Sequence, residues 1–219
     1  MMSPRQSTPP QTSHRGMLAC MGLPPDDSEL VQILDASLAE AARRAGPWLA
    51  CRPGCTQCCH GAFAINALDA LRLRTGMEAL RVSDPSTAVA IETRARAWLA
   101  EYGPAFPGDP VTGILGTSDS DQARFDQFAD DAPCPALNPA TGLCDVYAAR
   151  PMTCRLFGPP TRMGDGAELG CCELCFIGAS ESEIAACEMP VPHRLESRLL
   201  SDIDSDSTAE TVVAFALLR

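Results

Sequence analysis

The sequence predicts an α+β fold, mainly helical with small β-hairpins, that forms a compact cysteine-rich metal-binding domain. Three observations support this prediction. Several segments place apolar residues at helical spacing, Pro- and Gly-rich turns separate them, and the 219-residue chain contains 12 cysteines. Because 46% of the residues are hydrophobic, one apolar core is expected. We therefore expect a single cysteine-cluster domain over residues 26–219.

The N-terminal residues 1–25 are rich in Pro, Ser, Thr and Gln and contain no continuous apolar segment. This composition predicts a disordered N-terminal tail and gives no sign of a signal peptide. Without an export signal, a cytoplasmic location is expected, where thiols stay reduced. No apolar run is long enough to cross a bilayer as a helix, so we predict no membrane partner.

The charge of the chain argues against direct binding of nucleic acid. The formal net charge is −11, and the basic residues form no stripe that could follow a phosphate backbone. All 17 positively charged residues are arginines, because the sequence contains no lysine. A phosphate-binding lysine, a Schiff base and a lysine general base are therefore excluded.

Three helices are predicted in the first half of the chain from apolar residues at helical spacing. N-cap residues precede each helix, a proline follows the cap of the third, and glycines are expected to end all three. Gly76 is expected to end the second helix, which Asn66 caps. The expected helical ranges are 28–45, 66–76 and 85–103.

The second half of the chain predicts smaller elements. A loop is expected over residues 103–121, followed by a short amphipathic segment around Phe125 and Phe128. Turn residues predict two hairpins, and a Ser180/Glu183 capping box begins the first of two later helices. The apolar C-terminus is expected to dock on the core. The hairpins are expected at 134–147 and 155–171, and the helices at 180–188 and 192–203.

Four cysteines lie within nine residues in the pattern Cys51-x3-Cys55-x2-Cys58-Cys59. Ordinary packing does not need this density, although isolated buried cysteines do behave as small hydrophobes. A tight loop with Pro and Gly can turn several sulfurs toward one metal ion or cluster. In a reducing compartment, such clustered cysteines are typical of metal ligands rather than disulfides.

Further thiols lie far along the chain from this loop. Cys134, Cys144 and Cys154 are each ten residues apart, and hairpins between them could return their sulfurs to one place. Cys172 and Cys175 form the C-x2-C pair that is usual at metal sites. These five complete the set of nine predicted ligands.

Several other residues near these thiols are weaker candidates. Cys171 competes with its two neighbours, and the choice among the three stays open. His60, next to the four-cysteine loop, is an alternative ligand, although a lone histidine is more often structural. Cys20, in the tail, and Cys187, on a predicted helix, are assigned to no site.

The segments CRPGCTQCC and CPALNPATGLCDVYAARPMTCRLF resemble the YkgJ-like cysteine-cluster family over roughly residues 48–158. The resemblance implies a cytoplasmic bacterial protein that chelates zinc or iron. One relative, the flagellin lysine N-methylase, implies that such a domain can also serve methyl transfer with an iron–sulfur cluster. This chain shows no clear motif for that activity.

We interpret the chain as a metal-binding cysteine-cluster protein whose cofactor is zinc or iron, with an iron–sulfur cluster as one form of the latter. Arg150 and Arg155 are expected either to offset the charge of the thiolates or to pair with carboxylates such as Asp145. No catalytic residue is assigned, and whether the protein is an enzyme stays open. The alternatives are an iron–sulfur-dependent protein methyltransferase and a zinc-stabilised module that binds a protein partner.

Overall fold

The computed structural model describes residues 22–162, 168–203 and 209–219. The predicted tail over residues 1–25 lies almost entirely outside this part of the chain. The described residues are mainly helical, which confirms the predicted fold class. The helices are α1 (Asp27–Ala45), α2 (Ala67–Ser83), α3 (Pro85–Tyr102), α4 (Asp119–Phe125), α5 (Met152–Leu156), α6 (Glu181–Ala186), α7 (His193–Ile203) and α8 (Val213–Ala216).

Short elements connect these helices. Four 3-10 helices are described, namely η3 (Gly46–Trp48), η4 (Gln57–Cys59), η5 (Gly103–Ala105) and η6 (Tyr147–Ala149). Six two-residue strands form three antiparallel pairs, in which β1 (Ala64–Ile65) pairs with β6 (Thr211–Val212), β2 (Gly108–Asp109) with β3 (Ile114–Leu115), and β4 (Thr161–Arg162) with β5 (Leu169–Gly170).

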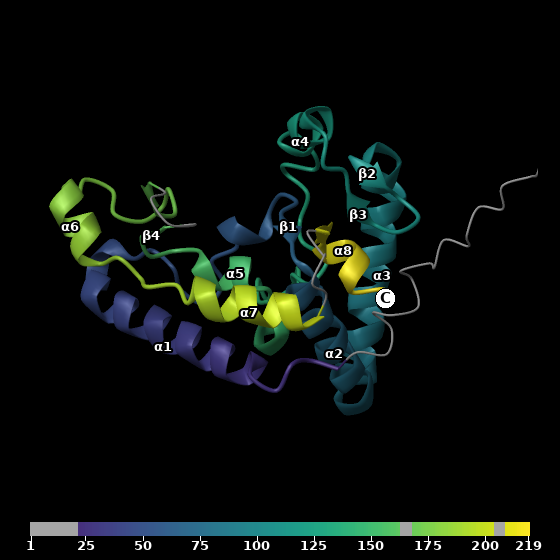
Figure 1. Cartoon of the computed structure of the whole chain (residues 1–219), viewed down its shortest axis with the longest axis horizontal. Helices are drawn as coiled ribbons and strands as arrows, with labels where there is room; N and C mark the ends of the chain where they lie inside the picture. Colours follow the sequence, from purple (N-terminus) through teal and green to yellow (C-terminus); the bar gives the residue numbers. More distant parts are fainter. Residues whose placement is uncertain (1–21, 163–167, 204–208) are drawn as a thin grey trace, which may run out of the picture.

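The helices spread along one long axis (Figure 1). α1 runs along one side with α6 at its far end, whereas α3 and the β2–β3 hairpin lie at the opposite end. α5 and α7 lie between these two ends. The β1–β6 pair brings the C-terminal segment against the residues that follow the four-cysteine loop, because Ala64 pairs with Val212.

Local capping chemistry sets the helix boundaries that the sequence predicts correctly. The Asp84 carboxylate accepts a hydrogen bond from the Thr87 amide at 3.1 Å and begins α3. Ser180 and Glu183 form the predicted capping box at the start of α6. The predicted helices at 28–45, 85–103, 180–188 and 192–203 are confirmed as α1, α3, α6 and α7. The N-cap predicted for the first of them is wrong, because no side chain caps α1.

The predicted end of the second helix at Gly76 is wrong. Asn66 does cap α2, because its side chain accepts a hydrogen bond from the Asp69 amide, but the helix continues to Ser83. The reason for the glycine is packing: a Cβ at position 76 would overlap the Cβ of Ala149 in η6. Gly76 therefore allows a close approach within the helix rather than ending it.

The predicted hairpins are only partly correct. The expected loop over 103–121 contains the β2–β3 hairpin, and the expected hairpin over 134–147 is reduced to a turn with one bridge, between Leu137 and Cys144. The second expected hairpin forms as β4–β5, although residues 155 and 156 belong to α5. Its predicted turn falls outside the described residues.

Four groups of buried apolar residues form the core. One joins α2, α3 and α8 through Leu73, Ile91 and Leu217, which confirms that the C-terminal segment docks on the core. A second joins α1 to α7, and a third gathers the aromatic side chains around Trp98. The fourth contains Cys175 and Cys187 with Phe176, beside the η3 turn.

A buried ionic network joins the starts of three helices. The Arg72 guanidinium donates two hydrogen bonds to Asp27, at 2.5 and 3.2 Å, and another to Asp69. Asp69 also accepts a hydrogen bond at 2.8 Å from the amide of Met152, the first residue of α5. All three charged side chains are almost completely buried, so each depends on the others for its partners.

Replacing Arg72 by Met should leave two buried carboxylates without their cation. We expect Arg72→Met to lower the free energy of unfolding by about 3–5 kcal/mol, as measured by urea denaturation at fixed metal content. Arg43→Met removes an exposed arginine that pairs with Glu40, and it should cost less than about 1 kcal/mol. An equal decrease in the free energy of unfolding in the two variants would contradict the role assigned to the network.

Gly76→Ala tests the close packing of α2 on η6. Alanine normally stabilises a helix relative to glycine, but here the added methyl group meets Ala149, so we expect a loss of about 1–3 kcal/mol in urea denaturation. The double variant Gly76→Ala/Ala149→Gly removes the opposing methyl group and should recover most of this loss. A stabilising effect of Gly76→Ala alone would show that the contact is unimportant.

Candidate metal centre

All eleven cysteines in the described part of the chain are free thiols. Nine of them are the predicted ligands, and the other two are Cys171 and Cys187. Cys187 is buried in the fourth core group, and its assignment to no site stays a prediction. Cys20 lies outside the described residues.

The folded chain divides the predicted ligands into two groups, within each of which the thiols act electrostatically on one another. The first thiol set contains Cys58, Cys59, Cys134, Cys144 and Cys154. The second thiol set contains Cys51, Cys55, Cys172 and Cys175. Each set combines part of the four-cysteine loop with cysteines from later in the chain, so the CxxxCxxCC signature is shared between the two.

Backbone hydrogen bonds assemble the first thiol set. The Cys134 amide donates to the Cys59 carbonyl at 2.7 Å, and a bridge joins His60 to Pro133. The turn that follows Cys134 returns the chain, because Leu137 and Cys144 form an antiparallel bridge. This pairing also explains the place of His60, whose backbone holds the loop while its side chain is exposed.

Cys154 reaches the first thiol set from α5, whose position depends on the ionic network. The bond from the Met152 amide to Asp69 anchors the start of α5, two residues before the thiol. At the other end of α5, Arg155 donates to Asp35 at 2.6 Å and to the Ala148 carbonyl at 2.7 Å. Sequence reasoning missed the contact of Asp69 with α5, because Met152 lies 83 residues further along the chain.

Burial raises the pKa of three thiols in the first set, those of Cys134 (to about 11), Cys144 and Cys154. Neighbouring thiols of the same set raise these values further. Backbone amides act in the opposite direction, since those of Ala136 and Leu137 donate to the Cys134 sulfur and that of Val146 to Cys144. Such amides favour thiolates at fixed positions.

Cys58 and Cys59 form a hydrogen-bonded pair at the centre of the first thiol set. The Cys59 thiol donates to the Cys58 sulfur, which lowers the pKa of Cys58 to about 6 and raises that of Cys59. The positive charge of Arg150 also contributes to the lower pKa of Cys58. Cys58 is therefore the member of this pair that more readily carries negative charge.

Arg150 acts on two thiols of the first set, and Arg94 acts on a third, Cys134. The Arg150 guanidinium lies 4.1 Å from the centre of the Tyr147 ring and acts electrostatically on Cys58 and Cys144. Its buried Nε atom has no hydrogen-bond partner among the described residues. Of the two arginines predicted either to offset thiolate charge or to pair with carboxylates, Arg155 is held by Asp35 and backbone carbonyls. Arg150 does both, because it acts on thiols and also lies 3.9 Å from the Asp35 carboxylate.

Asp145 pairs with neither of those arginines. Its carboxylate accepts a hydrogen bond at 2.7 Å from Arg94 of α3, which also donates to the Pro135 carbonyl at 2.8 Å. Arg94 therefore attaches the Cys134–Cys144 turn to a long helix. Sequence reasoning missed this role, because the pattern around Arg94 is that of an ordinary helix. Its partner Asp145 lies 51 residues further along the chain.

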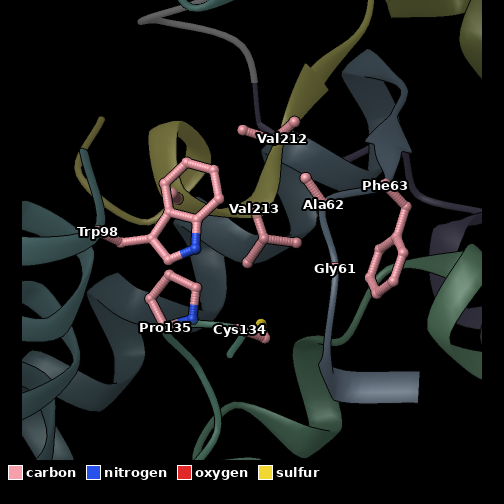
Figure 2. Close-up of a pocket in the computed structure, with 9 residues that line it drawn as sticks. Gly61, Ala62, Phe63, Trp98, Cys134, Pro135, Val212 and Val213 are labelled. Carbon is pink, nitrogen blue, oxygen red and sulfur yellow. The ribbon is translucent and has the colours of Figure 1, made fainter. Parts of the chain in front are cut away.

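The residues that pack against one side of Cys134 are mostly apolar and leave little space between them. Figure 2 shows Cys134 and Pro135 beside Trp98 and Val213, with the segment from Gly61 to Phe63 opposite. The hollow between them has a volume of about 10 Å³, which leaves room for at most one water molecule. Water has little access to Cys134 from this side, which agrees with the effect of burial on its pKa.

The second thiol set lies beside the fourth core group, where Gly158 contacts Cys51. A Cβ at position 158 would lie 2.9 Å from the Cys51 sulfur, and Gly158 has a φ of +118°, in a region that favours glycine. Cys51 is exposed as a residue, but partial burial of its sulfur and the nearby Cys175 thiol raise its pKa to about 12. No local pattern in the sequence reveals the role of Gly158.

No three His, Cys, Asp or Glu side chains in the described residues are arranged to hold a metal ion as they stand. The identity of the ligands therefore stays a prediction. The donor chemistry does fit zinc or iron, because both sets consist of thiols and amides already donate to several of the sulfurs.

None of the helices in the described ranges is long and apolar enough to cross a membrane.

Comparison with family models matches residues 50–175 to the CxxCxxCC family, described as "Putative zinc- or iron-chelating domain". No curated protein and no solved structure matches the chain. The match confirms the cysteine-cluster resemblance and extends past residue 158, where that resemblance ends, to include the cysteines at 171–175. It covers more than half of the 219 residues. The chain therefore belongs to the CxxCxxCC family of zinc- or iron-chelating domains.

Proposed function

We propose that this protein binds zinc or iron through the nine thiols of the two sets, Cys51, Cys55, Cys58, Cys59, Cys134, Cys144, Cys154, Cys172 and Cys175. The observation that carries the proposal is the gathering of thiols from separate parts of the chain, with backbone amides donating to several sulfurs. Thiolates that bind a metal need such donors.

The donor set suits either metal. Zinc bound by four thiolates would stabilise the fold, whereas an iron–sulfur cluster would supply electron transfer. The free state of the eleven described cysteines agrees with a reducing compartment such as the cytoplasm. The alternatives are still a protein methyltransferase and a zinc-stabilised module with a protein partner. No contact in the described residues favours one of these two over the other.

Metal analysis of two alanine variants tests the proposal. Protein purified without oxygen should contain zinc or iron by elemental analysis, and Cys134→Ala should lower this content. Cys187→Ala is the matched control, because Cys187 is a buried cysteine that belongs to neither thiol set. Wild-type protein without either metal, or equal metal contents in the two variants, would overturn the proposal.

Arg150→Gln tests whether this arginine supports metal binding. Removing its charge should weaken the affinity of the protein for zinc by about 10-fold or more, in competition with a chromogenic chelator. Arg96→Gln removes an equal charge from an exposed pair with Glu92 and should leave the affinity unchanged. Circular dichroism should show native helix content in both variants. Equal affinities in the two variants would place Arg150 outside the metal site.

A further inference from the structure

The second thiol set is built from two short turns that face each other. The Cys55 amide donates to the Arg52 carbonyl at 2.9 Å, which closes the turn after Cys51. The Cys175 amide donates to the Cys172 carbonyl at 2.8 Å, which closes the C-x2-C turn. Each turn carries two thiols, as paired metal-binding turns do, although the side chains must rotate before three of them could hold an ion.

The thiols of the two turns contact one another. Cys175 shares side-chain hydrogen bonds with both Cys51 and Cys172. Cys55 acts electrostatically on Cys51 and Cys172, so it lies close to the same group. The Leu174 amide donates to the Cys172 sulfur, as amides do to Cys134 and Cys144 in the first thiol set.

Other contacts hold the two turns together independently of the thiols. The Phe176 amide donates to the Trp48 carbonyl at 2.8 Å, and the Gln57 side chain donates to Glu173 at 2.6 Å. The Cys172 amide donates to the carbonyl of Gly158, the residue that contacts the Cys51 sulfur. The apposition of the turns is therefore a property of the folded backbone.

The two thiol sets are separate from each other. Cys134 and Cys144 pack against the core group of α2, α3 and α8, whereas Cys172 and Cys175 belong to the core group beside η3. In the described chain, the only thiols that act on each perturbed thiol of the two sets belong to its own set, and Cys171 is acted on by Cys175. One shared ion could not satisfy both groups, because zinc takes four ligands.

We propose that Cys51, Cys55, Cys172 and Cys175 form a second metal centre, distinct from the centre of the first thiol set, which binds one zinc-type ion through four thiolates. The ion displaces the thiol protons to solvent as it binds. Cys171 stays outside the centre, because it precedes the C-x2-C turn and, of the second thiol set, only Cys175 acts electrostatically on it. This inference rests on the proposed metal-binding function and assigns it two separable sites.

Zinc reconstitution of the metal-free, reduced full chain tests the two centres. We expect wild-type protein to bind zinc at both, Cys172→Ala to lose the ion of the second centre alone, and Cys144→Ala to lose metal from the first alone. Cys171→Ala, which alters the adjacent thiol, should retain the wild-type zinc content. An unchanged zinc content in Cys172→Ala, or loss of all zinc in both ligand variants, would overturn the separate centre.

A measurement on the wild-type chain avoids the risk that a variant fails to fold. Zinc-loaded protein is treated with iodoacetamide at increasing chelator concentration, and mass spectrometry identifies the alkylated cysteines. We expect Cys51, Cys55, Cys172 and Cys175 to become reactive together, at a chelator concentration different from that of the first set. Simultaneous reaction of all nine thiols would overturn two centres. Wild-type protein that binds no zinc or iron would overturn the proposed function itself.

Discussion

The buried contact between Arg72 and its two carboxylates is the interaction on which the arrangement of this protein most depends. It joins α1 through Asp27 to α2 through Asp69, and Asp69 in turn holds the first amide of α5. Desolvation of these charges is costly, so the network forms only when all its members are in place. The position of Cys154 depends in part on this network, because Asp69 anchors the first residue of the five-residue helix α5.

The sequence predicts the helices better than it predicts their contacts. Capping at Asp84 and Ser180 depends on neighbouring residues, so local patterns are sufficient to place α3 and α6. Gly76 shows where this reasoning fails. Its local pattern is the same for a helix end as for a close contact, and only the position of Ala149 in space distinguishes the two. The two-residue strands are similarly too short to leave a periodic pattern.

For the candidate site, the clustering of cysteines in the sequence identifies the thiols as candidate ligands. The sequence does not reveal that they divide into two sets. Cys55 and Cys58 are neighbours in one signature, yet one belongs with Cys172 and the other with Cys144. A signature describes spacing along the chain, whereas the partners of each sulfur depend on turns more than seventy residues away. The residues around the thiols, Arg94 and Gly158 among them, were missed because they carry no pattern of their own.

The apposition of the turns at Cys51–Cys55 and Cys172–Cys175 has a consequence for how this chain resists unfolding. A metal ion between them would act as a cross-link that closes a loop of more than a hundred residues. A covalent link across a loop of that length lowers the entropy of the unfolded chain by an amount equivalent to about 4–5 kcal/mol. Disulfides give this benefit to secreted proteins but do not persist where thiols are kept reduced. In this chain the same gain in stability would depend on the supply of metal. Removal of the metal would lower the free energy of unfolding without the reduction of any disulfide.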